Sequence, residues 1–424
     1  MLKLPPVLRG YTAHQSLKIL AASAFNNAVS LGVTVFAARQ LGPAEFGKFA
    51  LAVSAATLLA LALDFGLSLT LVRIYNAEPN RTEGLRMVTA VLRVKLALLL
   101  FAAALSYPVS TLIVRWGPAL LAGSTDLVAL AIVSGALLNL WVGVRAGEQA
   151  GGDFGTFARF TVLYGLLRLI SAAVLVIAGT VTGMGVFAIL YPIPLVALLG
   201  WNLAASHRSV LTPTPTDGWS AELTRLRRAA TYSMWVAVST FTFTSLSRLP
   251  QFALARRSSA VDVGLYSAAL SILAFFSLLN DAVRTTLLPR VAALRTRHER
   301  RDWNRRLLEL TPIVLGGLGL GVISAAGALY FVMGPAYQSS APLFLLLGGA
   351  TAVTIQLGLF TMMVHAHGIP DLDARVNVGR LLVLGLLLVV LPPNATTAAI
   401  SFATVLVLGE TGLYLLLRRR DVPV

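Results

Sequence analysis

Six ionisable side chains interrupt long apolar stretches of this sequence, and they are its best candidates for chemistry: Asp64, Arg168, Arg248, Asp281, Arg284 and Glu410. An ionised side chain in hydrocarbon costs about 2.5–3.5 kcal/mol, so each is expected to face protein or a water-filled cavity. A planar guanidinium matches the oxygens of a phosphate group. A buried carboxylate can carry a proton or pair with a cation. The set therefore predicts anion binding and charge pairing rather than covalent catalysis.

Two of the arginines stand without an acid nearby in the sequence. Arg248 lies among hydroxyl side chains, two residues before Pro250, which is expected to kink its helix. We predict that Arg248 holds a phosphate in a cavity, with snorkelling to headgroups or pairing with an acid as the alternative. Arg168 lies near the middle of its stretch, beside Tyr164. Snorkelling is harder at that depth, so Arg168 needs a partner or a cavity.

The acids have two interpretations each. Asp281 and Arg284 are three positions apart on one helix face, which predicts a local ion pair or an inner gate with a phosphate contact at Arg284. Asp64 is expected to pair with a basic residue near its own inner loop, with proton coupling as the alternative. Glu410, in the inner half of the last stretch, is either the partner of an arginine or a proton carrier.

Two further arginines, Arg39 and Arg256, end the first and seventh apolar stretches. They are expected to anchor these ends at the outer interface, or to line an outer mouth that attracts an anionic head group. Asn139 and Gln356 are uncharged polar residues in apolar stretches, and such residues more often bond neighbouring helices than a substrate.

The sequence lacks the residues that covalent catalysis, ATP hydrolysis or metal binding would require. The sequence has no cysteine and no Walker A loop, and no nucleophile is arranged with a base. His365 and His367 alone do not make a metal site. We therefore expect no catalytic residues, no metal, no cofactor and no enzymatic activity.

Membrane-spanning helices are the elements that would position these residues. Of the 424 residues 57% are hydrophobic and 12% charged, against roughly 25% charged residues in a soluble domain. This composition excludes a soluble enzyme, a nucleic-acid-binding module and a disordered scaffold. It predicts an all-α polytopic membrane protein, with twelve windows long enough to span: 15–38, 46–72, 85–107, 119–144, 157–179, 183–205, 229–255, 263–288, 307–333, 341–366, 375–392 and 396–417.

The basic residues set the orientation. Of the 34 Lys and Arg residues, we assign 26 to inner loops and termini, Lys95 and Arg380 among them, five to outer loops, and Arg168, Arg248 and Arg284 to spans. Because cytoplasmic loops carry an excess of Lys and Arg, both termini are predicted to face the cytoplasm. The formal net charge of +16 is then mostly a topology signal and not evidence for nucleic-acid binding.

An internal repeat relates the two halves of the chain at an offset of 217 residues. Between residues 38 and 73, nine of 36 positions are identical to their mates, among them the pairs Arg39 and Arg256, Gly47 and Gly264, and Asp64 and Asp281. Six helices in each half make this a parallel repeat about an axis along the membrane normal, around a central cavity. The predicted domains are 1–208 and 225–424, joined by a cytoplasmic linker at 209–224.

At this point the motifs resemble a known family. Ala38-Arg39-Gln40-Leu41-Gly42-Pro43 with Glu45-Phe46-Gly47, then Gly264-Leu265-Tyr266-Ser267 and Gly334-Pro335-Ala336-Tyr337, are similar to Wzx-type bacterial polysaccharide flippases. These belong to the multidrug/oligosaccharidyl-lipid/polysaccharide exporter superfamily. The family often has an acid just before the arginine of the seventh span, where this sequence has Ser247.

The resemblance implies a flippase in the bacterial inner membrane. It would carry an undecaprenyl-pyrophosphate-linked oligosaccharide to the outer leaflet by alternating access, for surface polysaccharide biosynthesis. Implied partners are this lipid-linked substrate, membrane lipids, a proton or sodium ion as the coupling ion, and other polysaccharide assembly proteins.

Three rivals remain. A cation-coupled multidrug exporter usually needs an acid in the first span, and this first span has none. A flippase for the lipid-linked peptidoglycan precursor typically has two further helices. A membrane glycan polymerase or ligase needs a large catalytic outer loop, and the outer loops here are short.

Overall fold

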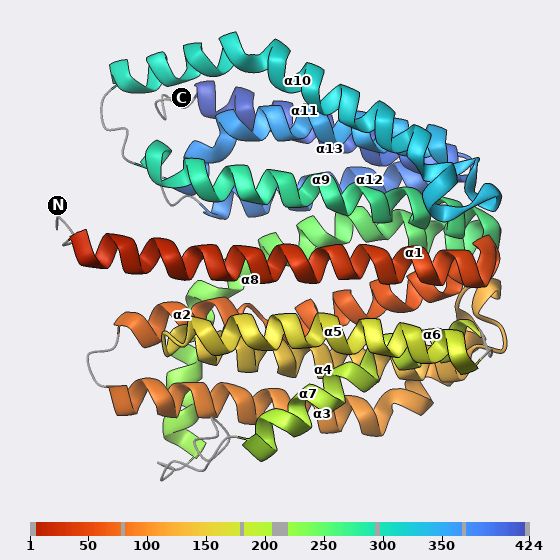
Figure 1. Ribbon diagram of the computed structural model, residues 1–424, viewed down its shortest axis with the longest axis horizontal. Helices are drawn as coiled ribbons and strands as arrows, with labels where there is room; N and C mark the ends of the chain where they lie inside the picture. The colour runs from red at the N-terminus through yellow and green to blue at the C-terminus, as the bar shows by residue number, and fades with distance from the viewer. Residues whose placement is uncertain are drawn as a thin grey trace. The chain divides into compact units, whose positions relative to one another are not determined.

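Helices make up all the regular structure of the described residues (Figure 1). The computed structural model describes residues 6–77, 81–178, 182–205, 219–292, 297–366 and 370–419. The predicted all-α fold is therefore confirmed. In chain order the elements are α1 (Pro6–Asp64), α2 (Leu67–Ala77), α3 (Arg81–Trp116), η1 (Ala119–Leu121), α4 (Thr125–Ala150), α5 (Phe154–Ala178), α6 (Gly183–Leu190), α7 (Pro192–Ala205), α8 (Trp219–Arg257), α9 (Ala260–Ala292), α10 (Arg297–Met333), η2 (Pro335–Tyr337), α11 (Ser340–Ala366), α12 (Pro370–Val390) and α13 (Ala395–Arg419).

The helices follow the predicted windows and break where glycine or proline demands it. α1 passes through the first two windows with a kink at Gly42, whose φ of 68° is in the left-handed region that glycine tolerates. Phe65 and Gly66 also have positive φ and separate α1 from α2. The window 183–205 is divided between α6 and α7 just before Pro192.

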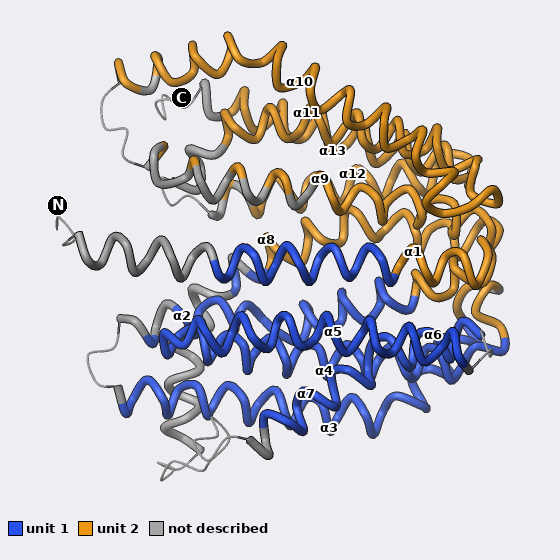
Figure 2. The backbone as a smooth tube through the Cα atoms, in the orientation of Figure 1, with its two compact units in different colours: residues 1–33, 52–116, 123–237 blue, residues 34–51, 117–122, 238–424 orange. Residues whose placement is uncertain are grey.

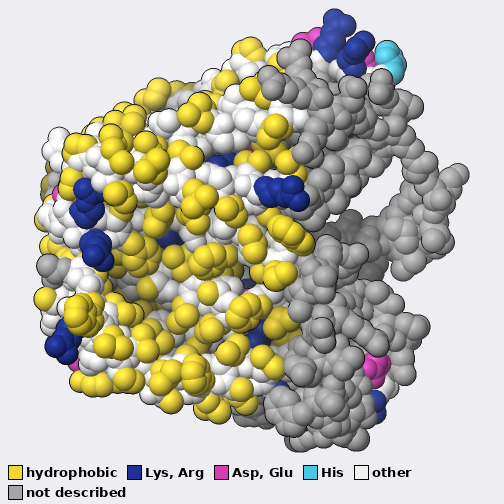
Figure 3. All heavy atoms as spheres, turned by 180° about the vertical axis from the view of Figure 1, so that it is seen from behind, with side chains coloured by type: hydrophobic (Ala, Val, Ile, Leu, Met, Phe, Trp, Pro, Cys, Tyr) yellow, Lys and Arg dark blue, Asp and Glu magenta, His cyan; other side chains and the backbone are white. Residues whose placement is uncertain are grey.

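The outer faces of the helices suit a membrane. Eight helices among the described residues are long and apolar enough to cross one. Large hydrophobic side chains such as Leu100, Phe101 and Ile177 are exposed. Figure 3 shows one face covered by hydrophobic side chains with few charged ones between them. The prediction of a multi-pass membrane protein is confirmed.

The chain forms two compact units (Figure 2). Unit 1 contains residues 1–33, 52–116 and 123–237, and unit 2 contains 34–51, 117–122 and 238–424. Two short segments of the first sequence half thus pack with the second half. Most of the predicted linker 209–224 lies outside the described residues, so the division of the chain at that linker stays a prediction.

Unit 1 has a continuous apolar core. Buried side chains of α2, α3, α4 and α7 form one cluster, which includes Leu71, Leu92, Trp141 and Leu198. Apolar contact with side chains of α5 extends this core. These helices hold the buried charged groups of unit 1 at fixed positions.

In unit 2 the segment 34–51 packs tightly against α9. A Cβ atom added at Gly47 would lie 2.6 Å from the carbonyl oxygen of Ala260, and one at Gly264 would clash with the carbonyl of Pro43. Gly47 and Gly264 are mates in the sequence repeat, so the two glycines allow the same close approach from both sides. The hydroxyl of Tyr337 also donates to the carbonyl oxygen of Ala38 at 2.9 Å.

Candidate functional site

Arg168 is a buried cation near the middle of α5 in unit 1, and its side chain is only 3% exposed. Its Nη1 donates to Ser30 Oγ at 2.6 Å. Its guanidinium also lies over two aromatic rings, 5.5 Å from the centroid of Tyr164 and 4.7 Å from that of Tyr191. Among the described residues, no carboxylate lies within 4.0 Å of it.

Two nitrogen atoms of this guanidinium have no hydrogen-bond acceptor in the described residues. Nε and Nη2 of Arg168 are buried, and neither donates a hydrogen bond within the described part of the chain. Close packing of α5 on α1 brings Ser30 near, because a Cβ at Gly165 would lie 3.1 Å from Phe25. The arrangement can accept an anion, since an arginine offers five N–H donors in a planar fork.

Asp64, by contrast, has a cation beside it. Lys95 of α3 donates to Asp64 Oδ1 at 2.5 Å and to Asn139 Oδ1 of α4 at 2.5 Å. The hydroxyl of Ser68 donates to the same Asp64 oxygen at 2.5 Å. Among the described residues, the basic partner of Asp64 is therefore a lysine of a different helix, 31 positions away. Whether Asp64 also acts as a gate stays a prediction.

Lys95 is fully buried, and the chain makes room for it. A Cβ atom at Gly143 of α4 would lie 2.5 Å from Cδ of Lys95, so only glycine lets the lysine stem pass. From the sequence, Lys95 is expected in an inner loop. The structure corrects this assignment, because the side chain lies within the helix packing of unit 1.

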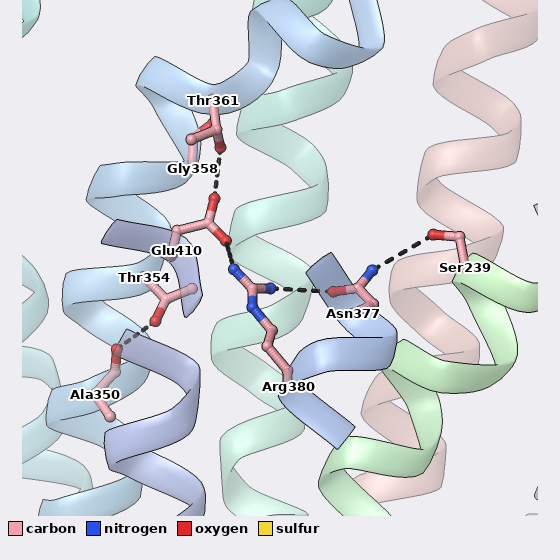
Figure 4. A network of polar contacts seen from close by, with 8 residues as sticks. All are labelled: Ser239, Ala350, Thr354, Gly358, Thr361, Asn377, Arg380 and Glu410. Carbon is pink, nitrogen blue, oxygen red and sulfur yellow. Dashed lines mark hydrogen bonds and ion pairs between the residues drawn. The ribbon is translucent and has the colours of Figure 1, made fainter. Parts of the chain in front are cut away.

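Unit 2 contains a second buried pair (Figure 4). Nη2 of Arg380 in α12 donates to Glu410 Oε2 of α13 at 2.7 Å, and Nη1 donates to Asn377 Oδ1 at 3.1 Å. Thr361 of α11 donates to the other carboxylate oxygen of Glu410 at 2.5 Å. Asn377 in turn reaches Ser239 of α8 at 3.5 Å. Four helices of unit 2 are thus joined through one neutral charge pair.

A glycine again admits the basic side chain. A Cβ atom at Gly409 would clash with Nε of Arg380, a buried nitrogen that donates no hydrogen bond within the described residues. Arg380 is 5% exposed and Glu410 8%. Like Lys95, Arg380 had been assigned to an inner loop, and the structure places it inside the helix packing of its unit.

Arg248 is half-buried on α8. Its charge acts on the buried phenol of Tyr266 on α9. The hydroxyls around it mostly bond their own helix, as Thr242 does to Val238 and Ser247 to Thr244. A role of Arg248 in substrate binding stays a prediction.

The predicted outer arginines differ from each other. Nε of Arg39 donates to the carbonyl oxygen of Val332 at 2.7 Å, and its Nη2 donates to that of Phe331, so Arg39 caps the end of α10. Arg256 is exposed. Its neighbour Arg257 caps α12 instead, through the carbonyl oxygens of Leu388 and Val389 at 2.5 and 2.8 Å. A cation at a helix C-terminus is favourable because unpaired carbonyls concentrate there.

Two predicted residues cannot be placed. The side chains of Asp281 and Arg284 lie outside the described residues, although the backbone of both belongs to α9. Their ion pair or gate stays a prediction.

Polar residues also link neighbouring helices, as predicted. Asn139 of α4 accepts from Lys95 of α3, and Gln356 of α11 donates to Thr311 of α10 at 2.7 Å. These two residues are repeat mates, so each unit uses the same position to bond the same pair of helices. Among the described residues, no three His, Asp or Glu side chains gather to hold a metal ion.

Sequence reasoning missed Lys95, Arg380 and a third buried group, Glu148 of α4. One signal was available, since Lys95 and Arg380 lie inside the windows 85–107 and 375–392. Nothing in the sequence spacing pairs Lys95 with Asp64 or Arg380 with Glu410.

Comparisons with known proteins agree on the fold. A family model described as polysaccharide biosynthesis protein matches residues 36–342, more than half of the chain. No curated protein sequence matches the chain closely enough to count as a relative.

Solved structures superpose over nearly the whole chain. An inward-facing multidrug resistance MATE family transporter of the MOP superfamily has a TM-score of 0.70 at 12% identity, covering 93% of this chain and 94% of its own. The lipid II flippase MurJ in an inward closed conformation has a TM-score of 0.69 at 13% identity, covering 94% and 87%. An outward-facing MATE transporter scores 0.59 at 12% identity, covering 96% and 95%.

Proposed function

The chain belongs to a family of polysaccharide biosynthesis proteins and has the fold of the exporter superfamily that its motifs resemble, and we propose that it is a flippase for a lipid-linked oligosaccharide. The substrate would be an undecaprenyl-pyrophosphate-linked oligosaccharide, moved from the inner to the outer leaflet for surface polysaccharide biosynthesis. The protein would act in a bacterial inner membrane with both termini in the cytoplasm. Other polysaccharide assembly proteins would supply and use the substrate.

One observation carries this proposal. Arg168 is buried, has two unused N–H donors and has no carboxylate within 4.0 Å in the described part of the chain. A buried cation without an internal counter-ion is costly, so its counter-ion is best supplied by a ligand. A pyrophosphate offers the oxygens that a guanidinium fork binds best.

The surroundings of Arg168 support a transient rather than a permanent anion. Tyr164 and Tyr191 hold the guanidinium through their rings, and Ser30 holds one nitrogen. Ring contacts with a cation are worth about 0.5–2 kcal/mol each, and they bring no negative charge. The arginine is thus positioned without being neutralised. In the alternating-access mechanism that we propose, Arg248 and the outer Arg256 would contribute further basic contacts along the substrate's path.

The drug-exporter alternative is less well supported. Such a protein needs a carboxylate available to a cationic substrate. Asp64 and Glu410 are instead paired with Lys95 and Arg380 in the described residues. No observation favours this alternative over the oligosaccharide flippase.

The test is leaflet transfer in liposomes. We expect protein with Arg168→Ala to lose about ten- to a hundredfold of the transfer rate for a labelled undecaprenyl-pyrophosphate oligosaccharide, because a hydrogen bond to a charged group contributes about 1.5–3 kcal/mol. Arg168→Lys should recover part of it. The matched control is Arg305→Ala, which removes an exposed arginine paired with Glu309. Full transfer by well-folded Arg168→Ala protein would overturn the assignment.

A further inference from the structure

Glu148 is a buried carboxylate that has no basic nitrogen within 4.0 Å in the described part of the chain. It lies in the last turn of α4 in unit 1, and its residue is 9% exposed. Its one hydrogen bond comes from Asn202 Nδ2 of α7, at 3.5 Å to Oε1. The other oxygen, Oε2, is buried and has no hydrogen-bond partner.

The guanidinium of Arg145, the basic group that acts on Glu148, does not form an ion pair with it. Arg145 is three positions earlier on the same helix and acts on Glu148 through its charge, but no nitrogen of it lies within 4.0 Å of the carboxylate in the described residues. Its guanidinium instead covers the ring of Phe157, 4.3 Å from the centroid. The other charge acting on Glu148 is Asp153, which is of the same sign. Asp153 is occupied in capping α5, where it accepts from the backbone N–H of Thr156 at 2.9 Å.

Among the described side chains, the remaining helices packed on α4 bring no counter-ion to Glu148. α6 and α7 have no charged residue. On α3, Glu83 pairs with Arg86, Lys95 pairs with Asp64, and Arg93 has contacts of its own. On α5, Arg159 is exposed and Arg168 lies beside Tyr164 and Tyr191. The side chain of Arg73 on α2 lies outside the described residues.

The place of Glu148 in its helix also opposes a negative charge. The carbonyls of Gly147 and Glu148 accept from Gly151 and Asp153 at the end of α4. The C-terminal end of a helix carries partial negative charge, which disfavours an anion there. Burial, the like charge of Asp153 and the helix end favour the neutral, protonated acid, against the smaller opposing effects of the Arg145 charge and the Asn202 amide N–H.

We propose that Glu148 is a proton-binding site, and that its proton is the one exchanged with water during transport. Binding forms an O–H bond at Oε2, and release returns the proton to water. Loss of the proton creates a carboxylate three residues from Arg145. This arginine also acts on Tyr164, whose ring lies under Arg168. The charge of Glu148 can therefore reach the anion site, and this second step rests on the proposed function.

The first experiment tests the proton without any substrate. The full chain in detergent is examined by infrared spectroscopy for the C=O stretch of a protonated carboxyl group, at neutral pH. We expect the band in the unmodified protein and its loss in Glu148→Gln. The matched control is Glu309→Gln, which makes the same change at an exposed acid paired with Arg305 and should leave the band. A band that is absent from the unmodified protein, or unchanged in Glu148→Gln, would overturn the proton site.

The second experiment tests the exchange. In liposomes, a pH gradient should stimulate oligosaccharide transfer by the unmodified protein and by Glu309→Gln, but not by Glu148→Gln. Equal stimulation of Glu148→Gln would show that its proton is not the one exchanged. If the unmodified protein transfers no oligosaccharide at all, the proposed function fails, while the infrared result still decides the proton site.

Discussion

Two buried arginines on equivalent helices of the repeat behave differently. Arg168 lies on α5 of unit 1 and Arg380 on α12 of unit 2, and their exposed fractions are 3% and 5%. Arg380 has a carboxylate at 2.7 Å and an amide oxygen at 3.1 Å, whereas Arg168 has one hydroxyl and two aromatic rings. Burial alone therefore does not identify a functional arginine. The presence or absence of an internal counter-ion separates the two.

The buried acids of the two units also differ in whether a basic group compensates their charge. In unit 2, Glu410 accepts from both Arg380 and Thr361, so its charge is fully compensated. In unit 1, Asp64 is compensated by Lys95, but Glu148 is not compensated in the described residues. Unit 2 uses its buried charges to join helices. In unit 1, one cation and one acid stay uncompensated in the described residues, and these are the groups to which we assign a ligand and a proton.

The largest expected effect comes from breaking the pair in unit 2. Arg380→Met leaves Glu410 buried without a counter-ion, which should destabilise the protein by about 3–5 kcal/mol. The measurement is the midpoint of thermal or denaturant unfolding in detergent. Arg305→Met, at an exposed pair, is the control and should cost about 1 kcal/mol or less.

Removing both charges of that pair should restore stability. In Arg380→Met with Glu410→Gln, no buried charge remains, so we expect recovery to within about 1 kcal/mol of the unmodified protein. The double variant is compared with each single variant in the same unfolding measurement. A double variant as unstable as Arg380→Met alone would show that the pair is not the source of the loss.

A smaller effect is expected at the glycine that admits Lys95. Gly143→Ala places a methyl group against the lysine stem, and such overpacking should cost about 1–3 kcal/mol. Gly200→Ala on α7 is the control, because a Cβ there meets nothing within 4 Å. Equal unfolding midpoints for the two variants would contradict the close packing that holds the Asp64 and Lys95 pair.

Removing the helix cap made by Arg39 should lower the free energy of unfolding by less than the change at Gly143. Arg39→Ala removes a cation from the C-terminal end of α10, where such a charge is worth about 0.3–1 kcal/mol. The loss should be visible as a small shift of the unfolding midpoint, with little change in transfer rate. A large loss of transfer with an unchanged midpoint would favour the outer-mouth role instead.

The smallest effect on stability is expected at Arg168. Arg168→Met leaves no acid unpaired within the described residues, so the unfolding midpoint should not fall. Transfer of the lipid-linked oligosaccharide should be lost. If Arg168→Met were as destabilising as Arg380→Met, the contrast between the two arginines would not hold.

Much of the architecture could be predicted from the sequence. The apolar windows, the breaks near Gly42 and Pro192, and the all-helical fold follow from hydrophobicity and local backbone chemistry. The repeat placed Gly47 opposite Gly264 in register, and the structure shows both at one close contact. The family motifs were confirmed by the match over residues 36–342.

The pairing of buried charges could not be predicted. At the offset of the repeat, Arg380 corresponds to Leu163 and Arg168 to Gly385, so the charges themselves do not repeat. Lys95 was counted with the inner basic residues, although it lies inside the window 85–107 and its side chain is fully buried. Glu148 was assigned to a loop because the predicted window ends at residue 144, whereas α4 continues to Ala150.

The sequence by itself determined that the chain spans a membrane with helices, that its halves repeat, and which family it belongs to. These properties depend on hydrophobicity and short motifs, which are local along the chain. Only the tertiary structure decided which charges are neutralised. A counter-ion is found across helices, as between Lys95 and Asp64 or Arg380 and Glu410, and packing alone brings such distant residues within hydrogen-bond distance. The same packing leaves Arg168 and Glu148 buried without an oppositely charged group within 4.0 Å in the described residues.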